Sequence, residues 1–218
     1  MIGGDHSMFW TIGLVFVSLG ICLPLFLHYK RALRLHLACA YKCMGTICAV
    51  LPALISAFRL EPRCWICTVS LLIYCAADYV LEFNFILGAG LFLSGHICAI
   101  AYFLGLSSVS AVHLVAVLVF GASSLFIFWK WKKYIGNQML LFVIYGLSLV
   151  LMCSCSLGCF GLFNIMGIFI ACGGSLFFIS DILILRRTLF PSDKSIDWFI
   201  MITYYSAILL FGISCLFS

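Results

Sequence analysis

Charge is scarce in this sequence. Only 9% of its 218 residues are Asp, Glu, Lys or Arg, whereas 66% are hydrophobic, and the mean hydropathy is +1.26. A chain with so few polar residues cannot cover the surface of a soluble globule, so we predict an integral membrane protein. A basic stripe of the kind that follows nucleic acid is also missing, which sets DNA and RNA aside as partners.

Long polar connections are absent as well. Apolar runs of about 20 residues, enough to span a hydrocarbon core of about 30 Å, occur near 8–27, 36–57, 64–82, 85–106, 109–128, 139–157, 162–185 and 198–217. They predict an all-α bundle of eight transmembrane helices. The segments between them are too short to hold a second domain, so residues 1–218 are predicted to form one integral membrane domain. The first run is followed by basic residues and is interpreted as an uncleaved span.

Cysteine is plentiful, with 13 residues, but it does not follow a disulfide or metal pattern. Almost all the cysteines lie inside apolar runs, where a thiol acts as a small hydrophobic group that lets helices approach. Cys64 and Cys67 have the spacing of a zinc-binding pair, yet no second pair of ligands follows. We therefore predict neither a metal nor another cofactor.

Basic residues are distributed unevenly over the predicted connections. Nine lie on one side of the bundle and only Arg59 and Arg63 on the other, the nine being Lys30, Arg31, Arg34, Lys130, Lys132, Lys133, Arg186, Arg187 and Lys194. The positive-inside rule places the first group in the cytoplasm and both termini on the lumenal or external side. For a eukaryotic chain the expected location is the endoplasmic reticulum membrane.

Two acidic residues interrupt the apolar runs. A charged Asp at the centre of a membrane helix costs about 2.5 to 3.5 kcal/mol, so it usually faces a protein interior or a watery cavity. Asp181 lies close to Arg186, and the alternative is that it sits near the headgroups and merely ends its helix. Asp78 occupies the matching position in another helix of the same direction. Both carboxylates are therefore predicted at one level, about 6 Å inside the cytoplasmic boundary.

Further polar side chains are expected near this level. Lys42 is predicted about 10 Å deep, where it needs an anionic partner such as Asp78 or Asp181. Tyr204 and Tyr205 fall beside it. Helical spacing puts Glu82 on the face of Asp78, one turn further along its helix, and so adds an acid to the same group.

Glycines and a histidine near these carboxylates have two interpretations each. Gly174 lies two turns before Asp181 on one stripe, which predicts open space for a ligand beside the carboxylate. Gly88 and Gly95 are better explained by close helix packing. His96, near the midplane, either belongs to the site or simply bonds a neighbouring backbone carbonyl.

Five motifs follow in order along the chain, namely Lys42, Ala77-Asp78, Phe85-x-x-Gly88-x-x-x-Phe92-x-x-Gly95-His96, Gly174-x-x-Phe177-x-x-Ser180-Asp181 and Tyr204-Tyr205. Together they resemble the lysoplasmalogenase family, also called YhhN-like. The resemblance implies an eight-span membrane protein that hydrolyses the vinyl ether bond of lysoplasmalogens to a fatty aldehyde and glycerophosphocholine or glycerophosphoethanolamine. The chain departs from the family pattern at Cys43 (often Pro), at Ala99 (an aromatic) and after Tyr205, where the family has Gln.

Opening a vinyl ether requires a protonated acid and a base that guides water. Burial favours the protonated form of a carboxyl group and a nearby cation favours the charged form, so two carboxylates with unequal access to a lysine divide these roles. Asp78 and Asp181 are the predicted catalytic pair, and which of them is the acid stays open. The predicted substrate-binding or supporting residues are Lys42, His96, Tyr204, Tyr205, Glu82 and Ser180.

The expected partners are the membrane and a lysophospholipid held within it, and a homodimer is a further option. The phosphate would lie near Lys30, Arg186 or Arg187, although charges at these positions also serve to set topology. A serine hydrolase is disfavoured because no Gly-x-Ser-x-Gly motif is present, and a zinc hydrolase because the ligands are too few. The main alternative is a non-catalytic lipid-binding protein or a transporter with an intramembrane Asp/Lys site.

Overall fold

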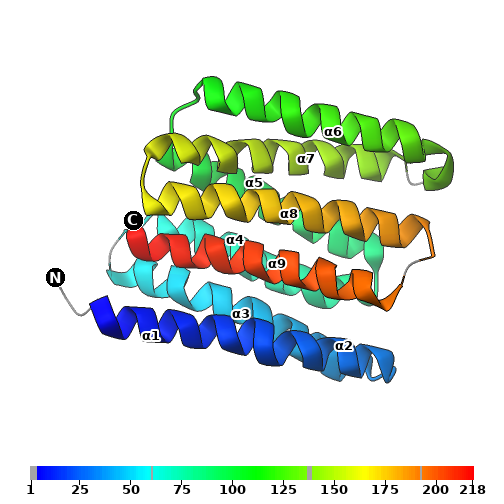
Figure 1. The fold of residues 1–218 in the computed structure, drawn as a ribbon, viewed down its shortest axis with the longest axis horizontal. Coiled ribbons are helices and arrows are strands. Elements are labelled where there is room, and N and C mark those ends of the chain that lie inside the picture. Colours follow the sequence, from blue (N-terminus) through cyan, green and yellow to red (C-terminus); the bar gives the residue numbers. More distant parts are fainter. Residues whose placement is uncertain (1–3, 60, 137–138, 192) are drawn as a thin grey trace.

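A computed structural model of the chain describes residues 4–59, 61–136, 139–191 and 193–218. These residues contain no strand, and eight of their helical stretches are long and apolar enough to cross a membrane (Figure 1). The predicted all-α fold with eight spans is confirmed.

The first span is a continuous helix with a change of winding in its middle. It consists of α1 (Gly4–Val15), a π-helical segment (Phe16–Cys22) and α2 (Leu23–Arg31). Pro24 lies at the start of α2 and has no N–H to donate to the preceding turn, which accounts for the wider winding just before it.

Seven further spans follow. They are α3 (Leu35–Arg59), α4 (Cys64–Leu81), α5 (Phe85–Leu106), α6 (Ala111–Ile135), α7 (Met139–Gly158), α8 (Ile165–Leu189) and α9 (Lys194–Ser214). Short 3-10 segments continue α7 over Cys159–Leu162 and α9 over Cys215–Phe217. Asn84 and Asn164 cap α5 and α8 by accepting hydrogen bonds from backbone N–H groups of the first turn.

Several helices extend beyond the predicted apolar runs. The run expected to end at 128 continues to Ile135 in α6, and the run expected to end at 185 continues to Leu189 in α8. The added turns carry basic residues, which favour a helix C-terminus and reach water with long side chains. Hydropathy alone therefore placed these boundaries too early.

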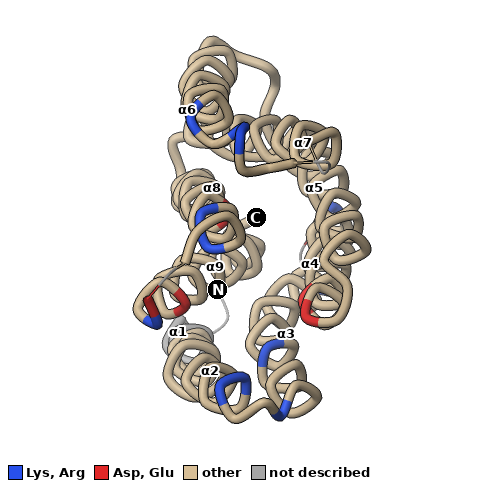
Figure 2. Tube along the Cα trace, turned by 90° about the vertical axis from the view of Figure 1, so that its right-hand side faces the viewer, with Lys and Arg blue, Asp and Glu red and all other residues tan. Residues whose placement is uncertain are grey.

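Six helices form a closed ring in which α3, α4, α5, α7, α8 and α9 each pack against the next, and α9 packs back on α3. The first span lies outside this ring against α3, and α6 lies outside it against α7. Figure 2 shows this arrangement end-on, from the end of the bundle at which α2, α4, α6 and α8 finish. We call it the basic end, because it holds the nine Lys and Arg residues identified above; that it faces the cytoplasm stays a prediction.

Aromatic side chains fill the middle of the ring. Tyr74 of α4, Phe92 of α5, Phe177 of α8 and Tyr204 of α9 are all buried, with ring centroids 5.3 to 6.4 Å apart. A Cβ on Gly95 would collide with the ring of Tyr74. The predicted packing role of this glycine is therefore confirmed, and it lets α5 approach α4 closely beneath the site.

Candidate active site

A cavity of about 740 Å³ opens between the aromatic cluster and the basic end. Its walls come from α2 to α9, and its size is within the range of roughly 300 to 1,000 Å³ that is usual for ligand sites. Most of the lining is apolar. The charged residues that line it are Lys30, Lys42, Asp78, Glu82, Asp181, Arg187 and Asp197.

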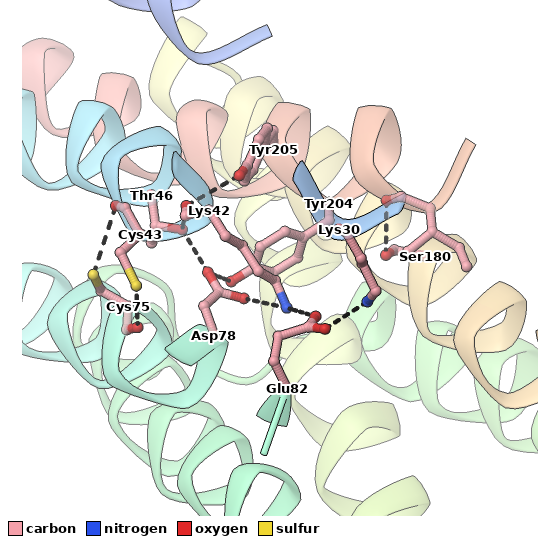
Figure 3. A network of polar contacts seen from close by, with 11 residues as sticks. Lys30, Lys42, Cys43, Thr46, Cys75, Asp78, Glu82, Ser180, Tyr204 and Tyr205 are labelled. Atoms are coloured by element: carbon pink, nitrogen blue, oxygen red, sulfur yellow. Dashed lines mark hydrogen bonds and ion pairs between the residues drawn. The ribbon is translucent and has the colours of Figure 1, made fainter. Parts of the chain in front are cut away.

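Asp78 is held by partners from two other helices, α3 and α9. Its Oδ2 accepts hydrogen bonds from Thr46 of α3 at 2.5 Å and from Tyr204 of α9 at 2.9 Å, while Lys42 Nζ lies 3.5 Å from its Oδ1 (Figure 3). The Asp78 side chain is 1% exposed. A carboxylate with a cation and two hydroxyl donors is stabilised in its charged form. Oδ1 itself accepts no hydrogen bond from the described residues.

Glu82 joins two lysines into a chain of charges. It lies just beyond the end of α4 and binds Lys42 Nζ at 3.0 Å and Lys30 Nζ at 2.5 Å (Figure 3). Burial raises the pKa of Glu82, but the positive charges of Lys42 and Lys30 outweigh it and lower that pKa to about 2. Both ammonium groups also lie over the ring of Phe26, at 5.2 and 5.5 Å from its centroid. Lys42 was predicted to pair with Asp78 or Asp181, and the structure pairs it with Asp78 and with Glu82.

Asp181 has a different environment. Its Oδ2 accepts a hydrogen bond of 2.6 Å from the Tyr145 hydroxyl of α7. No cation of the described residues lies within ion-pair distance of it. It lines the same cavity as Asp78, so the structure brings the two predicted carboxylates to one space while giving Lys42 to only one of them.

A separate ion pair lines the cavity near the basic end. Arg187 of α8 lies 2.9 Å from Asp197 of α9, and both side chains are partly exposed, at 38% and 20%. Together with Lys30 and Glu82 they form a rim of four charged groups around the cavity. The substrate phosphate was predicted to lie near Lys30, Arg186 or Arg187, and of these Lys30 and Arg187 line the cavity.

Tyr204, one of the predicted supporting residues, lines the cavity, whereas three others lie behind it. Tyr205 donates to the Lys42 carbonyl at 3.0 Å, which fixes α9 on α3. Ser180 donates to the carbonyl of Ile200 at 3.2 Å and joins α8 to α9, on the far side of the network in Figure 3. These two residues position the helices that carry the site.

His96 is fully buried and does not line the cavity. Its Nδ1 lies 3.1 Å from the Ser148 hydroxyl, and its ring packs 5.3 Å from that of Tyr145. It thus contacts a side chain of α7 and not the backbone carbonyl that was the alternative expectation. Tyr145 therefore contacts both His96, through its ring, and Asp181, through its hydroxyl.

The open space predicted beside Gly174 is absent. A Cβ at this position would collide with the Ser156 hydroxyl of α7, so Gly174 serves close packing of α8 on α7. The prediction was wrong because a shared stripe on one helix says nothing about which neighbour covers it. Cys43, where the family often has Pro, also serves helix packing. Its thiol donates to the Cys75 carbonyl of α4 at 3.5 Å, and the Cys75 thiol donates to the Cys43 carbonyl at 3.7 Å.

Two hydroxyl groups at the carboxylates were missed in the sequence. Thr46 lies one helical turn after Lys42 and therefore on its face, a signal that the spacing contained. Tyr145 lies six residues into α7, at about the depth of Asp181, and a tyrosine at that depth in an apolar helix was the available signal.

The order of groups along the cavity follows from their positions on the helices. The rim of Lys30, Glu82, Arg187 and Asp197 lies at the basic end, and Asp181 lies eight residues before the end of α8, about 12 Å further in. Beyond the carboxylates the lining is apolar apart from the hydroxyl of Ser124. From the basic end inward, the cavity is therefore lined first by the charged rim, then by the carboxylates and then by mostly apolar side chains.

Comparison with known proteins gives a match to the YhhN family over residues 37–215. The chain belongs to the YhhN family. This is the family of lysoplasmalogenases, and the matched segment contains both carboxylates, Lys42 and Tyr204. The helix that carries Lys30 lies before it, so this YhhN-family protein completes its charged rim with a residue outside the matched segment. Curated proteins and solved structures gave no match.

Proposed function

We propose that this YhhN-family protein hydrolyses the vinyl ether bond of lysoplasmalogens, giving a fatty aldehyde and a glycerophospho-base. One observation carries the proposal. Two carboxylates, the buried Asp78 and the half-buried Asp181, line one largely apolar cavity, and only Asp78 has a cation beside it, whereas Asp181 has a tyrosine hydroxyl. This is the division into base and acid that the reaction needs.

The succession of groups in the cavity supports a lysolipid as substrate. A lysoplasmalogen carries a phosphate head, a glycerol, a vinyl ether and a hydrocarbon chain in that order. The head would lie at the rim with its phosphate toward Lys30 and Arg187, the vinyl ether at the carboxylates and the chain beyond them. An ammonium on the head group would face Glu82 or Asp197, which supply the opposite charge at the same rim.

Asp181 would act as the acid. Burial without a cation favours a neutral carboxyl group, and Tyr145 donates to Oδ2, so the proton would sit on Oδ1. When this proton is transferred to the alkenyl carbon β to the ether oxygen, the double-bond electrons form the new C–H bond. A lone pair of the ether oxygen then stabilises the neighbouring carbon as an oxocarbenium ion. The Asp181 carboxylate formed in this step faces the developing positive charge and stabilises it.

Asp78 would act as the base. Lys42, Thr46 and Tyr204 favour its charged form and fix its orientation, and Oδ1, which accepts no hydrogen bond from the described residues, would take up a proton from water. Water attacks the oxocarbenium carbon and gives a proton to Asp78. The resulting hemiacetal collapses to the aldehyde and the glycerol hydroxyl, and the proton returns through water to Asp181, so that the net reaction consumes one water molecule.

Product analysis tests the proposal. Purified protein should release aldehyde from a lysoplasmalogen but no fatty acid from the ester-linked lysophospholipid of the same head group, because the mechanism forms no acyl-enzyme. Glu61→Gln, at the opposite end of the bundle, is a matched control and should act as wild type. Folded protein that releases no aldehyde would contradict the proposal and leave lipid binding or transport as the function.

A further inference from the structure

We infer that the part of the cavity between α6 and α7 is the seat of the substrate's hydrocarbon chain, and that Gly121 sets the chain length it accepts. This inference rests on the proposed function for the position of the head group. We call this part the tail arm and define it by Val117, Gly121 and Leu125 of α6 with Leu147 and Leu151 of α7, all of which line the cavity.

The tail arm has the chemistry of a hydrocarbon site. None of the described residues by which α6 and α7 line the cavity is charged, and their only side-chain polar groups are the hydroxyls of Ser124 and Tyr145. Tyr145 already bonds Asp181 at the near end of the arm. An alkenyl chain whose first carbons lie at Asp181 can therefore enter the arm along an apolar lining in which the Ser124 hydroxyl is the one further polar group of the described residues of α6 and α7.

Gly121 differs from the glycines that pack helices together. A Cβ on Gly95 or Gly174 would collide with a neighbouring helix, whereas a Cβ on Gly121 meets no described atom within 4 Å beyond its own helix and chain neighbours. Because Gly121 also lines the cavity, a larger side chain there would grow into the arm and not into protein. Its missing side chain thus leaves room for a ligand.

Position along the bundle places Gly121 deeper than the carboxylates. It lies fourteen residues before the end of α6, about 21 Å from the basic end, whereas Asp181 lies about 12 Å from that end. The two helices finish at the same end of the bundle (Figure 1). A short alkenyl chain whose first carbons lie at Asp181 would end before it reaches Gly121, whereas a long chain would extend past Gly121.

The outer wall of the arm is held in place at this level. Phe120, the residue before Gly121, packs against Phe178 of α8 with ring centroids 4.7 Å apart, and Phe178 itself lines the cavity. Elsewhere α6 packs chiefly on α7, and its outer face exposes large apolar side chains such as Leu118 and Phe126. Three residues of the tail arm are exposed as well, Leu125 at 70%, Leu147 at 61% and Leu151 at 49%. The arm is therefore open at the apolar surface of α6 and α7, through which a lipid chain can enter it.

Chain-length kinetics test the inference. Gly121→Leu should lower kcat/KM for an octadecenyl lysoplasmalogen by roughly tenfold or more, the usual effect of a misfitting methylene or two in an apolar pocket. Its kcat/KM for a hexenyl lysoplasmalogen should stay within about twofold of wild type. Gly90→Leu on α5 is the matched control, because its Cβ also meets no atom and it does not line the cavity. An unchanged preference between the two chains in Gly121→Leu would overturn the inference.

A binding measurement separates this inference from the proposed function. A saturated ether lysophospholipid with a photoreactive group at the end of an octadecyl chain cannot be hydrolysed by vinyl ether chemistry. It should crosslink to the stretch 113–121 of α6 in wild type, and this crosslink should be lost in Gly121→Leu but kept in Gly90→Leu. Crosslinking elsewhere overturns the tail arm even if aldehyde is released, whereas absent aldehyde with this crosslink overturns only the hydrolysis.

Discussion

The Tyr145 hydroxyl donates a hydrogen bond of 2.6 Å to Oδ2 of Asp181, across the contact between α7 and α8. The bond fixes one oxygen of a half-buried carboxyl group that lines the cavity. Asp78 has the opposite arrangement, since both hydroxyl donors bind its Oδ2 and a lysine stands at Oδ1. Asp78 thus lies beside a cation, whereas Asp181 lies beside a neutral tyrosine.

Replacing Tyr145 by Phe should reduce turnover more than stability. A hydrogen bond to a group that becomes charged contributes about 1.5 to 3 kcal/mol, so kcat for aldehyde release should fall roughly 10- to 150-fold. The melting temperature in detergent should change little, since the ring still packs against His96. Tyr134→Phe, 61% exposed on α6, is the control. Wild-type turnover in Tyr145→Phe would show that the orientation of Asp181 does not matter.

Replacing Lys42 by Met should chiefly destabilise the fold. The change leaves Asp78 and Glu82 without their shared cation, and removing one member of a buried ion pair costs roughly 3 to 5 kcal/mol. Thermal unfolding of the detergent-solubilised protein measures this, with Lys194→Met, on an exposed lysine, as control. A melting temperature equal to that of wild type would mean that Lys42 does not stabilise the two acids.

Glu82 gives stability a defined pH dependence. Its pKa is lowered to about 2 in the folded protein, below its ordinary value of about 4.3, so its contribution is complete above the ordinary value and disappears as the pH falls through about 2. Glu82→Gln should therefore unfold more easily than wild type at neutral pH, and the difference should shrink on acidification. A difference that stays constant from neutral pH to pH ~2 would contradict the two ion pairs.

Orientation follows from the charge count and can be tested separately. Nine basic residues at one end and two at the other predict that both termini are lumenal or external. Tags at the two termini should then resist protease added to intact microsomes and become sensitive after detergent. Digestion without detergent would place the basic end, and the mouth of the cavity, on the other side of the membrane.

The sequence predicted the parts of the site that depend on depth and missed those that depend on neighbours. Lys42 was deep enough to need an acid, and Asp78 stood at the right level, so their pairing could be expected. The partner of Asp181 could not, because helix order does not say that α7 presents Tyr145 to α8. The prediction of open space beside Gly174 was wrong for the same reason. Its role depends on Ser156 of another helix, which periodicity within one helix does not show.

Aldehyde release by Asp181→Asn tests the central claim most directly. Asp181 has no cation to strand, so the substitution should leave the melting temperature near that of wild type while it removes the transferable proton. Turnover of a lysoplasmalogen should fall by roughly 10²- to 10⁴-fold, as expected for loss of a general acid. Asp193→Asn, on an exposed residue before α9, should keep full activity. Folded Asp181→Asn that releases aldehyde at the wild-type rate would contradict the account.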